Sequence, residues 1–206
     1  MKQIGILGGS FNPITIGHLE MAFVVIKNTN IDEVWITPCY SHMQKNGFVA
    51  PEHRLEMCKI ASNNLPSIRA FDYEIANRLS EGTYEFMARL MRDESFSGYN
   101  FSYIIGGDNL NIFTTWRRFE DLKKLVRFIV VPRQGVKLQS EYQWCKESPH
   151  ILLNTSIMKV SSTSIRRLLK LRWMSMPLLS SWADRRLVGK IDGNVLGYIL
   201  KNGLYR

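Results

Sequence analysis

The chain has 206 residues, of which 45% are apolar, and its formal net charge is +9, from 27 Lys and Arg against 18 Asp and Glu. This length and apolar content predict one compact domain over residues 1–206, and no apolar run approaches the ~20 residues that span a bilayer. The N-terminus lacks the basic segment and apolar run of a signal peptide, and Cys39, Cys58 and Cys145 form no CxxC pair. These features argue against a membrane-bound or disulfide-stapled protein and predict a soluble, cytoplasmic one without a zinc site.

The positive charge favours an anionic partner, and nucleic acids and phosphorylated metabolites both qualify. Basic pairs recur along the chain, at 117–118, 123–124, 166–167 and 185–186. No basic run alternates with aromatic residues, however, so nucleic acid is the less favoured partner on sequence grounds. An ordinary solvated basic surface is the alternative to both.

Short apolar runs alternate with helical patterns along the chain. Runs typical of buried strands lie at 4–7, 34–36, 103–105, 128–131 and 151–153. Apolar spacing and a proline at a helix start predict helices over 19–26, from Pro51, over 84–91 and over 165–169. Strand and helix in alternation predict an α/β fold: a Rossmann-like, doubly wound parallel sheet with helices on both faces. Ligands of such a fold bind beyond the carboxyl ends of the strands.

The first predicted strand leads into a segment that begins with Gly8 and Gly9 and ends with His18, where the first amphipathic helix begins. The glycines let backbone N–H groups approach a phosphate, and the helix start adds partial positive charge. Thr15 and His18 are three residues apart, so they share one helix face and can both donate hydrogen bonds to phosphate oxygens. A lone histidine more often satisfies a local hydrogen bond, but the combination predicts a phosphate site.

A second hydroxyl-rich helix start follows the last predicted strand. It reads Ser161-Ser162-Thr163-Ser164-Ile165-Arg166 and opens a C-terminal helical part over about 161–206. Helix capping explains one of these hydroxyls. Several hydroxyls with free helix N–H groups and an arginine one turn in also form a phosphate cradle. For this segment alone, both interpretations stay open.

Together the two segments resemble the (H/T)xGH and SSTxIR signatures of the nucleotidyltransferase superfamily. Within it, the chain is similar to the nicotinate or nicotinamide mononucleotide adenylyltransferases over nearly its whole length. The run from Gly106 to Leu110 with Trp116 downstream resembles the family's GxDxL segment and its tryptophan. The run from Val131 to Gly135 resembles the family's strand-end arginine, and the residues at 198–205 resemble its terminal helix.

This resemblance implies an enzyme that transfers the adenylyl group of ATP to a pyridine mononucleotide and releases pyrophosphate. The implied catalytic residues are His18, Lys45 and Arg166. The implied ATP contacts are Gly8, Gly9, Ser10, Phe11, Thr15, His18, Gly106, Asp108, Ser161, Ser162 and Arg166. The implied mononucleotide contacts are Tyr84, Trp116 and Arg133. Mg²⁺ would arrive on the triphosphate rather than on a protein cage, and assembly into a homo-oligomer is left open.

Several alternatives accompany these assignments. Asp108 also suits a turn or cap, Trp116 a core position and Lys45 a solvated loop. The layout favours nicotinate mononucleotide as acceptor, with deamido-NAD as product, whereas Glu85 would favour nicotinamide mononucleotide if it points into the pocket. A rival of another class is a non-catalytic nucleotide-sensing or nucleic-acid-binding domain on the same fold.

Two segments depart from the family pattern. The basic loop reads Gln44-Lys45 with His42 nearby, so which side chain assists Lys45 is open. The stretch Leu171 to Asp184 is longer than the usual connection to the last helix, and its residue pattern is irregular. We expect it to be a lid, an interface or packed loop.

Overall fold

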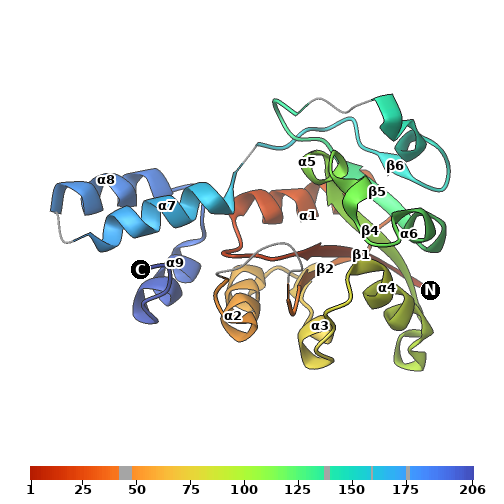
Figure 1. Ribbon diagram of the computed structural model, residues 1–206, viewed down its shortest axis with the longest axis horizontal. Coiled ribbons are helices and arrows are strands. Elements are labelled where there is room, and N and C mark those ends of the chain that lie inside the picture. The colour runs from red at the N-terminus through yellow and green to blue at the C-terminus, as the bar shows by residue number, and fades with distance from the viewer. Residues whose placement is uncertain (42–47, 137–139, 159, 175–176) are drawn as a thin grey trace.

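The computed structural model of the chain describes residues 1–41, 48–136, 140–158, 160–174 and 177–206, and a parallel six-stranded sheet runs through it (Figure 1). The strands are β1 (Lys2–Gly9), β2 (Glu33–Pro38), β3 (Ile68–Ala70), β4 (Tyr99–Gly106), β5 (Arg127–Val131) and β6 (Ile151–Leu152). They lie in the order β3-β2-β1-β4-β5-β6, so the chain winds outward from β1 and starts again at β4 on its other side. The predicted doubly wound α/β fold is confirmed, and the strand order reverses between β1 and β4.

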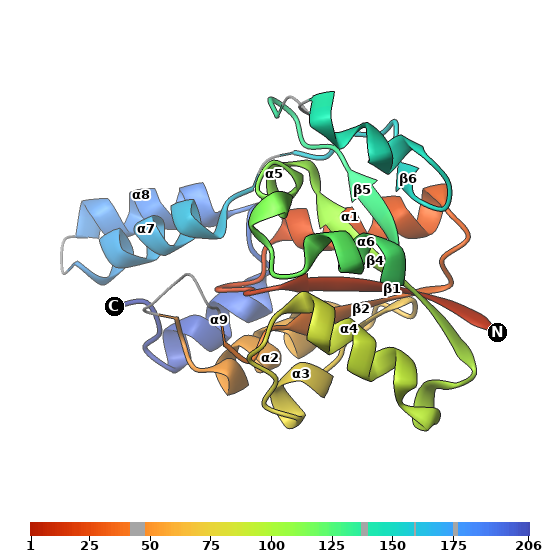
Figure 2. The ribbon, with the colours of Figure 1, turned by 45° about the vertical axis from the view of Figure 1, so that its right-hand side comes forward.

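Helices pack on both faces of this sheet (Figure 2). One face carries α1 (Ile16–Asn28), α2 (Pro51–Ser62), α7 (Ser162–Trp173) and α9 (Gly193–Lys201). The other carries α3 (Tyr73–Ala76), α4 (Thr83–Arg92), α5 (Gly107–Leu110) and α6 (Phe119–Leu125), with short 3₁₀ helices at Glu94–Phe96, Phe113–Thr115 and Ser140–Lys146. The sheet therefore divides the core into two layers.

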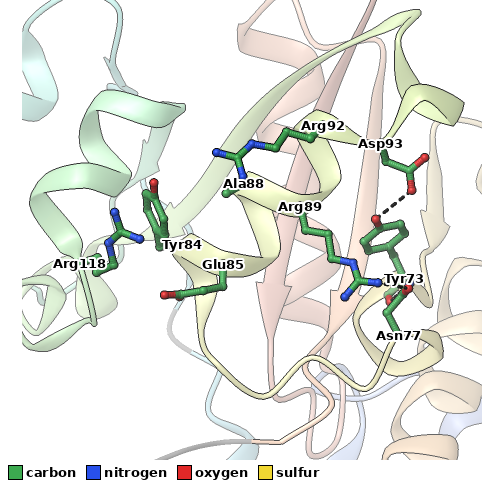
Figure 3. Close-up of a pocket in the computed structure, with 9 residues that line it drawn as sticks. All are labelled: Tyr73, Asn77, Tyr84, Glu85, Ala88, Arg89, Arg92, Asp93 and Arg118. Atoms are coloured by element: carbon green, nitrogen blue, oxygen red, sulfur yellow. Dashed lines mark hydrogen bonds between the residues drawn. The ribbon is translucent and has the colours of Figure 1, made fainter.

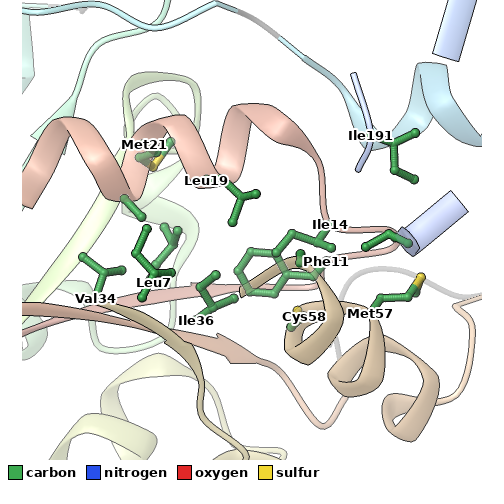
Figure 4. Close-up of a cluster of buried hydrophobic side chains, with 14 of the residues drawn as sticks. Leu7, Phe11, Ile14, Leu19, Met21, Val34, Ile36, Met57, Cys58 and Ile191 are labelled. Atoms are coloured by element: carbon green, nitrogen blue, oxygen red, sulfur yellow. The ribbon is translucent and has the colours of Figure 1, made fainter. Parts of the chain in front are cut away.

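The two core layers follow from the alternation of side chains along each strand. Leu7 faces the α1 side and packs with Ile36 and Phe11 (Figure 4). Its neighbour Ile6 faces the other side, in a cluster with Trp35. Strands buried on both faces read as continuous apolar runs, which is why the sequence revealed five of them.

Two parts of the fold differ from the sequence expectation. Strand β3 was not predicted, because three residues, Ile68–Ala70, are too few to show a pattern. The expected irregularity of Leu171 to Asp184 is wrong: α7 continues to Trp173 and α8 spans Pro177–Leu187. Proline suits the first turn of a helix, and Ala183 and Leu187, four residues apart, bury one face of α8.

Within the described ranges, no helix is long and apolar enough to cross a membrane. The three cysteines carry free thiols. Burial raises the pKa of the Cys58 thiol well above its ordinary value, which leaves it in the neutral form.

Candidate active site

The loop between β1 and α1 lies where β1 meets the switch in strand order. A side chain at Gly8 would overlap the hydroxyl of Tyr103 on β4, so this glycine allows the two strands to approach. Gly9 and the buried Phe11 are in contact, since a Cβ on Gly9 would lie 3.1 Å from the Phe11 ring. The edge of the Phe11 ring meets His18, with ring centroids 5.0 Å apart. The loop is thus closely packed around the predicted catalytic histidine.

His18 is oriented by Thr15, the residue that precedes α1. The Thr15 backbone N–H donates to Nδ1 of His18 at 3.0 Å, and the Thr15 hydroxyl lies 2.9 Å from the same nitrogen. Because Nδ1 accepts the backbone hydrogen bond, the neutral ring carries its proton on Nε2. Burial, and then the nearby Arg133 charge, lowers the pKa of His18 to about 3. At neutral pH the side chain is therefore an uncharged donor at Nε2.

The start of α7 packs against this first loop, although the two segments lie about 150 residues apart in the sequence. The Ser162 hydroxyl donates to the Pro13 carbonyl at 2.8 Å, and Arg166 Nη1 donates to the Asn12 carbonyl at 2.7 Å. The other end of the Arg166 guanidinium donates to Thr163 at 3.1 Å. The structure thus brings both signature segments together.

The hydroxyls at this helix start do not act as simple caps. Ser161 is the N-cap residue of α7, but its side chain makes no capping hydrogen bond. Its carbonyl instead accepts from the Ser164 hydroxyl at 2.7 Å. Capping therefore leaves the half-buried Ser161 hydroxyl unexplained.

Gly106, Asp108 and Arg133 converge at the ends of β4 and β5, beside α1. Asp108 Oδ1 and Arg133 Nε lie 3.2 Å apart, and a Cβ on Gly106 would lie 2.7 Å from the first and 3.1 Å from the second. The resemblance assigned Asp108 to ATP and Arg133 to the mononucleotide. In the structure the two side chains pair with each other, so the two sets of predicted contacts meet at this point.

Two of the predicted mononucleotide residues, Tyr84 and Trp116, lie on the opposite side of the sheet, whereas Arg133 stays on the α1 side. Trp116 is half-buried and packs edge-on against Phe113, with centroids 5.3 Å apart, and against Tyr103 at 6.1 Å. The guanidinium of Arg118 stands 3.7 Å from the centre of the Tyr84 ring (Figure 3). Trp116 is thus part of an aromatic cluster, and its side chain is still partly exposed to solvent.

Glu85 and Arg117 form an ion pair at this side, with Oε1 and Nε 3.7 Å apart. Oε2 of Glu85 is buried and has no hydrogen-bond partner among the described residues. Arg117 follows Trp116 in the chain, so the ion pair ties the segment that carries Trp116 to α4. Its positive member offsets the charge by which Glu85 would repel a carboxylate.

An open groove of about 530 Å³ runs along the outer side of α4 (Figure 3). Its lining residues are Tyr73, Asn77, Tyr84, Glu85, Ala88, Arg89, Arg92, Asp93 and Arg118. Of the predicted site residues only Tyr84 belongs to this set. The groove therefore borders the predicted acceptor side through Tyr84 and Glu85, and none of its lining residues belongs to the segments that bear His18 and Arg166.

Arg54 is a residue that the sequence reasoning missed. Its side chain is buried on α2 and donates to the carbonyls of Ser10 at 2.9 Å and Cys39 at 2.7 Å, and also to those of Val49 and Tyr40. It therefore joins the loop after β1 to the loop after β2. A signal was present: Arg54 stands at helical spacing with Met57, Cys58 and Ala61, on the face that must be buried.

Asn12 was also missed. It is 1% exposed, and its Oδ1 accepts from the Tyr205 hydroxyl at 2.8 Å and from the Val49 N–H at 3.4 Å. Its Nδ2 is buried without a partner among the described residues. The contact with Tyr205 spans the whole chain, so no local pattern could reveal it.

Lys45, with His42 and Gln44, lies outside the described residues, and its role stays a prediction.

Comparison with known proteins agrees with this geometry. The cytidylyltransferase-like family matches residues 6–168. A probable nicotinate-nucleotide adenylyltransferase of Enterococcus faecalis is 32% identical over 207 aligned positions, covering 100% of this chain and 85% of the relative. The nicotinate-nucleotide adenylyltransferase of Bacillus subtilis is 31% identical, covering 100% of this chain and 99% of the relative.

Among solved structures, Plasmodium falciparum nicotinic acid mononucleotide adenylyltransferase complexed with NaAD aligns with a TM-score of 0.80. Its sequence identity is 24%, and the alignment covers 100% of this chain and 98% of that one, so it supports the shared fold. The extent of the family match and of the two bacterial relatives settles the affiliation. The chain belongs to the cytidylyltransferase-like family and, within it, to the nicotinate-nucleotide adenylyltransferases.

Proposed function

We propose that this chain transfers the adenylyl group of ATP to nicotinate mononucleotide, forming deamido-NAD and pyrophosphate in NAD biosynthesis in the cytoplasm. The observation that carries the proposal is the meeting of two phosphate-binding helix starts. Ser162 and Arg166 at the start of α7 bind the backbone of the loop that ends at His18. The names of the bacterial relatives support nicotinate mononucleotide as acceptor.

The reaction needs alignment and charge neutralisation rather than a covalent intermediate. An oxygen of the acceptor's phosphate attacks the α-phosphorus of ATP and forms the new P–O bond. The bond between the α-phosphorus and its bridging oxygen breaks, and its electron pair leaves with pyrophosphate. The attacking phosphate is already ionised at neutral pH, so no general base has to remove a proton from it.

His18 and Arg166 have distinct tasks in this scheme. The neutral His18 keeps its proton and donates a hydrogen bond from Nε2–H to an oxygen of the transferring phosphate, where negative charge grows in the transition state. Arg166, held by Asn12, supplies a fixed positive charge from the α7 side. Lys45 is proposed to approach the triphosphate from the loop after β2. Mg²⁺ enters bound to ATP and needs few protein ligands.

The acceptor choice is proposed to depend on Glu85 and Arg117. Glu85 alone would favour the amide of nicotinamide mononucleotide over a carboxylate. Arg117, 3.7 Å from Glu85, offsets that charge. This pair supports nicotinate mononucleotide as the better acceptor, with nicotinamide mononucleotide as the second candidate.

The direct test mixes the purified protein with ATP, Mg²⁺ and each mononucleotide separately, and measures pyrophosphate and dinucleotide. Product from nicotinate mononucleotide at a higher kcat/KM than from its amide is expected. A roughly tenfold preference for the amide, which corresponds to ~1.4 kcal/mol, would reverse the acceptor assignment. ATP binding without pyrophosphate release from either acceptor would favour the non-catalytic nucleotide-sensing alternative.

A further inference from the structure

Helices α7 and α8 form a hairpin that the proposed reaction uses only at its base. In two views the hairpin projects away from the sheet (Figures 1 and 2). Its two helices hold one another, since Arg172 Nε and Asp184 Oδ1 lie 2.7 Å apart and Ala183 and Leu187 are fully buried. The connection is also longer than the family resemblance leads one to expect. The outer part of this hairpin therefore has no task in adenylyl transfer as described.

Two thirds of the chain's net positive charge falls in this part of the sequence. Residues 162–190 contain seven Lys and Arg but a single acidic residue, which accounts for six of the nine net charges of the chain. Four of the cations are exposed and have no described carboxylate within ion-pair distance: Arg167, Lys170, Arg185 and Arg186. Such a field attracts polyanions over several ångströms of solvent.

An exposed aromatic side chain accompanies these cations. Trp182 is 39% exposed, and the Arg186 guanidinium lies 5.2 Å from its ring centre. Arg185 and Arg186 follow Trp182 by three and four residues, so all three occupy one side of α8. A solvent-facing indole beside guanidinium groups offers a stacking surface for a nucleobase. The sequence shows no basic and aromatic alternation because helical spacing, not adjacency, brings these groups together.

We propose that the α7–α8 hairpin binds the phosphate backbone of a polynucleotide, with Trp182 stacking on an unpaired base. A second copy of the same face would meet like charge and be repelled. A lipid surface fits less well, because the other exposed large apolar side chains that the structure describes here, Met174 and Val188, stand before and after α8 rather than along it. A polynucleotide matches both the four exposed cations and the exposed Trp182 ring.

The test measures binding of the full chain to fluorescently labelled single-stranded RNA, single-stranded DNA and duplex DNA by anisotropy. We expect a dissociation constant of ~10⁻⁴–10⁻⁶ M near physiological salt. The logarithm of the association constant should fall linearly with the logarithm of the salt concentration. The RNA and DNA arms identify which polynucleotide is preferred. Absence of binding even at low salt overturns the proposal.

Charge removal tests whether the hairpin itself carries the binding. A variant with Arg167→Ser, Lys170→Ser, Arg185→Ser and Arg186→Ser should lose at least roughly tenfold in affinity while adenylyl transfer is unchanged. The matched control removes the same charge from exposed positions in other elements: Lys27→Ser, Lys59→Ser, Lys124→Ser and Lys146→Ser. Equal losses in both variants would show attraction by net charge alone and overturn the assignment.

Two further readouts separate the proposal from its rivals. Trp182→Ala should lower the affinity for single-stranded RNA or DNA by roughly tenfold, because only an unpaired base can stack on the ring. The affinity for duplex DNA should stay nearly unchanged. If the four-site variant instead raises the KM for ATP and keeps its polynucleotide affinity, the charge steers substrates and the proposal fails. Should the four-site variant not fold, the pair Arg185→Ser and Arg186→Ser, on the exposed side of α8, replaces it with the same criteria.

Discussion

The two sides of the proposed active site differ in what holds their side chains. On the ATP side, His18, Ser162 and Arg166 all bind backbone groups of one loop. On the acceptor side, side chains contact one another: Tyr84 lies against Arg118, and Glu85 faces Arg117. Backbone partners persist when a neighbouring residue changes, whereas side-chain pairs are rearranged by one substitution. The ATP side should therefore be fixed by the fold, and the acceptor side should be the adjustable one.

Replacing His18 tests the ATP side most strongly. His18→Ala should lower kcat by about 10²–10³, the usual cost of removing one preorganised donor. The melting temperature should hardly change, because the described hydrogen bonds of the ring involve only Thr15. His53→Ala is the control, since His53 contacts Tyr198 and lies outside the predicted site. Loss of stability in step with activity would identify His18 as a structural residue.

Replacing Arg54 tests whether the loops on the ATP side contribute to the stability of the fold. Arg54→Ala removes a buried guanidinium and leaves four backbone carbonyls without their donor. The free energy of unfolding, measured by urea denaturation, should fall by about 3 kcal/mol. Lys59→Ala, at an exposed position of the same helix, should stay within about 0.5 kcal/mol of the parent. Equal stability of the two variants would contradict this account.

On the acceptor side, one uncharged substitution should change specificity without changing the fold. Glu85→Gln removes the charge opposite Arg117, so Arg117 attracts a carboxylate more strongly. The ratio of kcat/KM for nicotinate over nicotinamide mononucleotide should rise several-fold, up to about tenfold, or ~1.4 kcal/mol. Arg117→Gln should lower the same ratio. An unchanged ratio in both variants would place the pair outside the acceptor pocket.

The last prediction concerns the pH dependence of stability and lies outside the two sides of the site. Burial raises the pKa of Glu74 to about 8, although its Oε1 accepts from the Tyr40 N–H at 3.1 Å. The folded chain therefore keeps a proton that the unfolded chain releases from about pH 4.5 upward. The contribution of Glu74 to the free energy of unfolding is full at low pH and is lost as pH rises towards 8. Glu74→Gln should flatten this profile, whereas Glu52→Gln, at an exposed position of α2, is the control and should leave its slope unchanged.

The sequence predicted those features that residues close together in the chain determine. Continuous apolar runs revealed five strands, and hydroxyl, glycine and histidine residues at helix starts revealed both signature segments. It could not predict that Asp108 and Arg133 pair, because that contact arises from the ends of adjacent strands. It could have predicted Arg54 from helical spacing, but a charged residue on an apolar face was not read as buried. Helix α8 was missed because Pro177 and the Met and Trp residues around it obscured the pattern.

The ATP side depends on a segment that is synthesised long after it. The Tyr205 hydroxyl binds Asn12 across 193 residues, and the Trp173 indole donates to the Leu204 carbonyl at 3.1 Å. A nascent chain that had left the ribosome only as far as Arg166 would hold every predicted substrate residue. It would still lack Tyr205, the nearer of the two donors to Asn12 Oδ1. The loop that precedes His18 therefore acquires this hydrogen bond only after residue 205 has been synthesised.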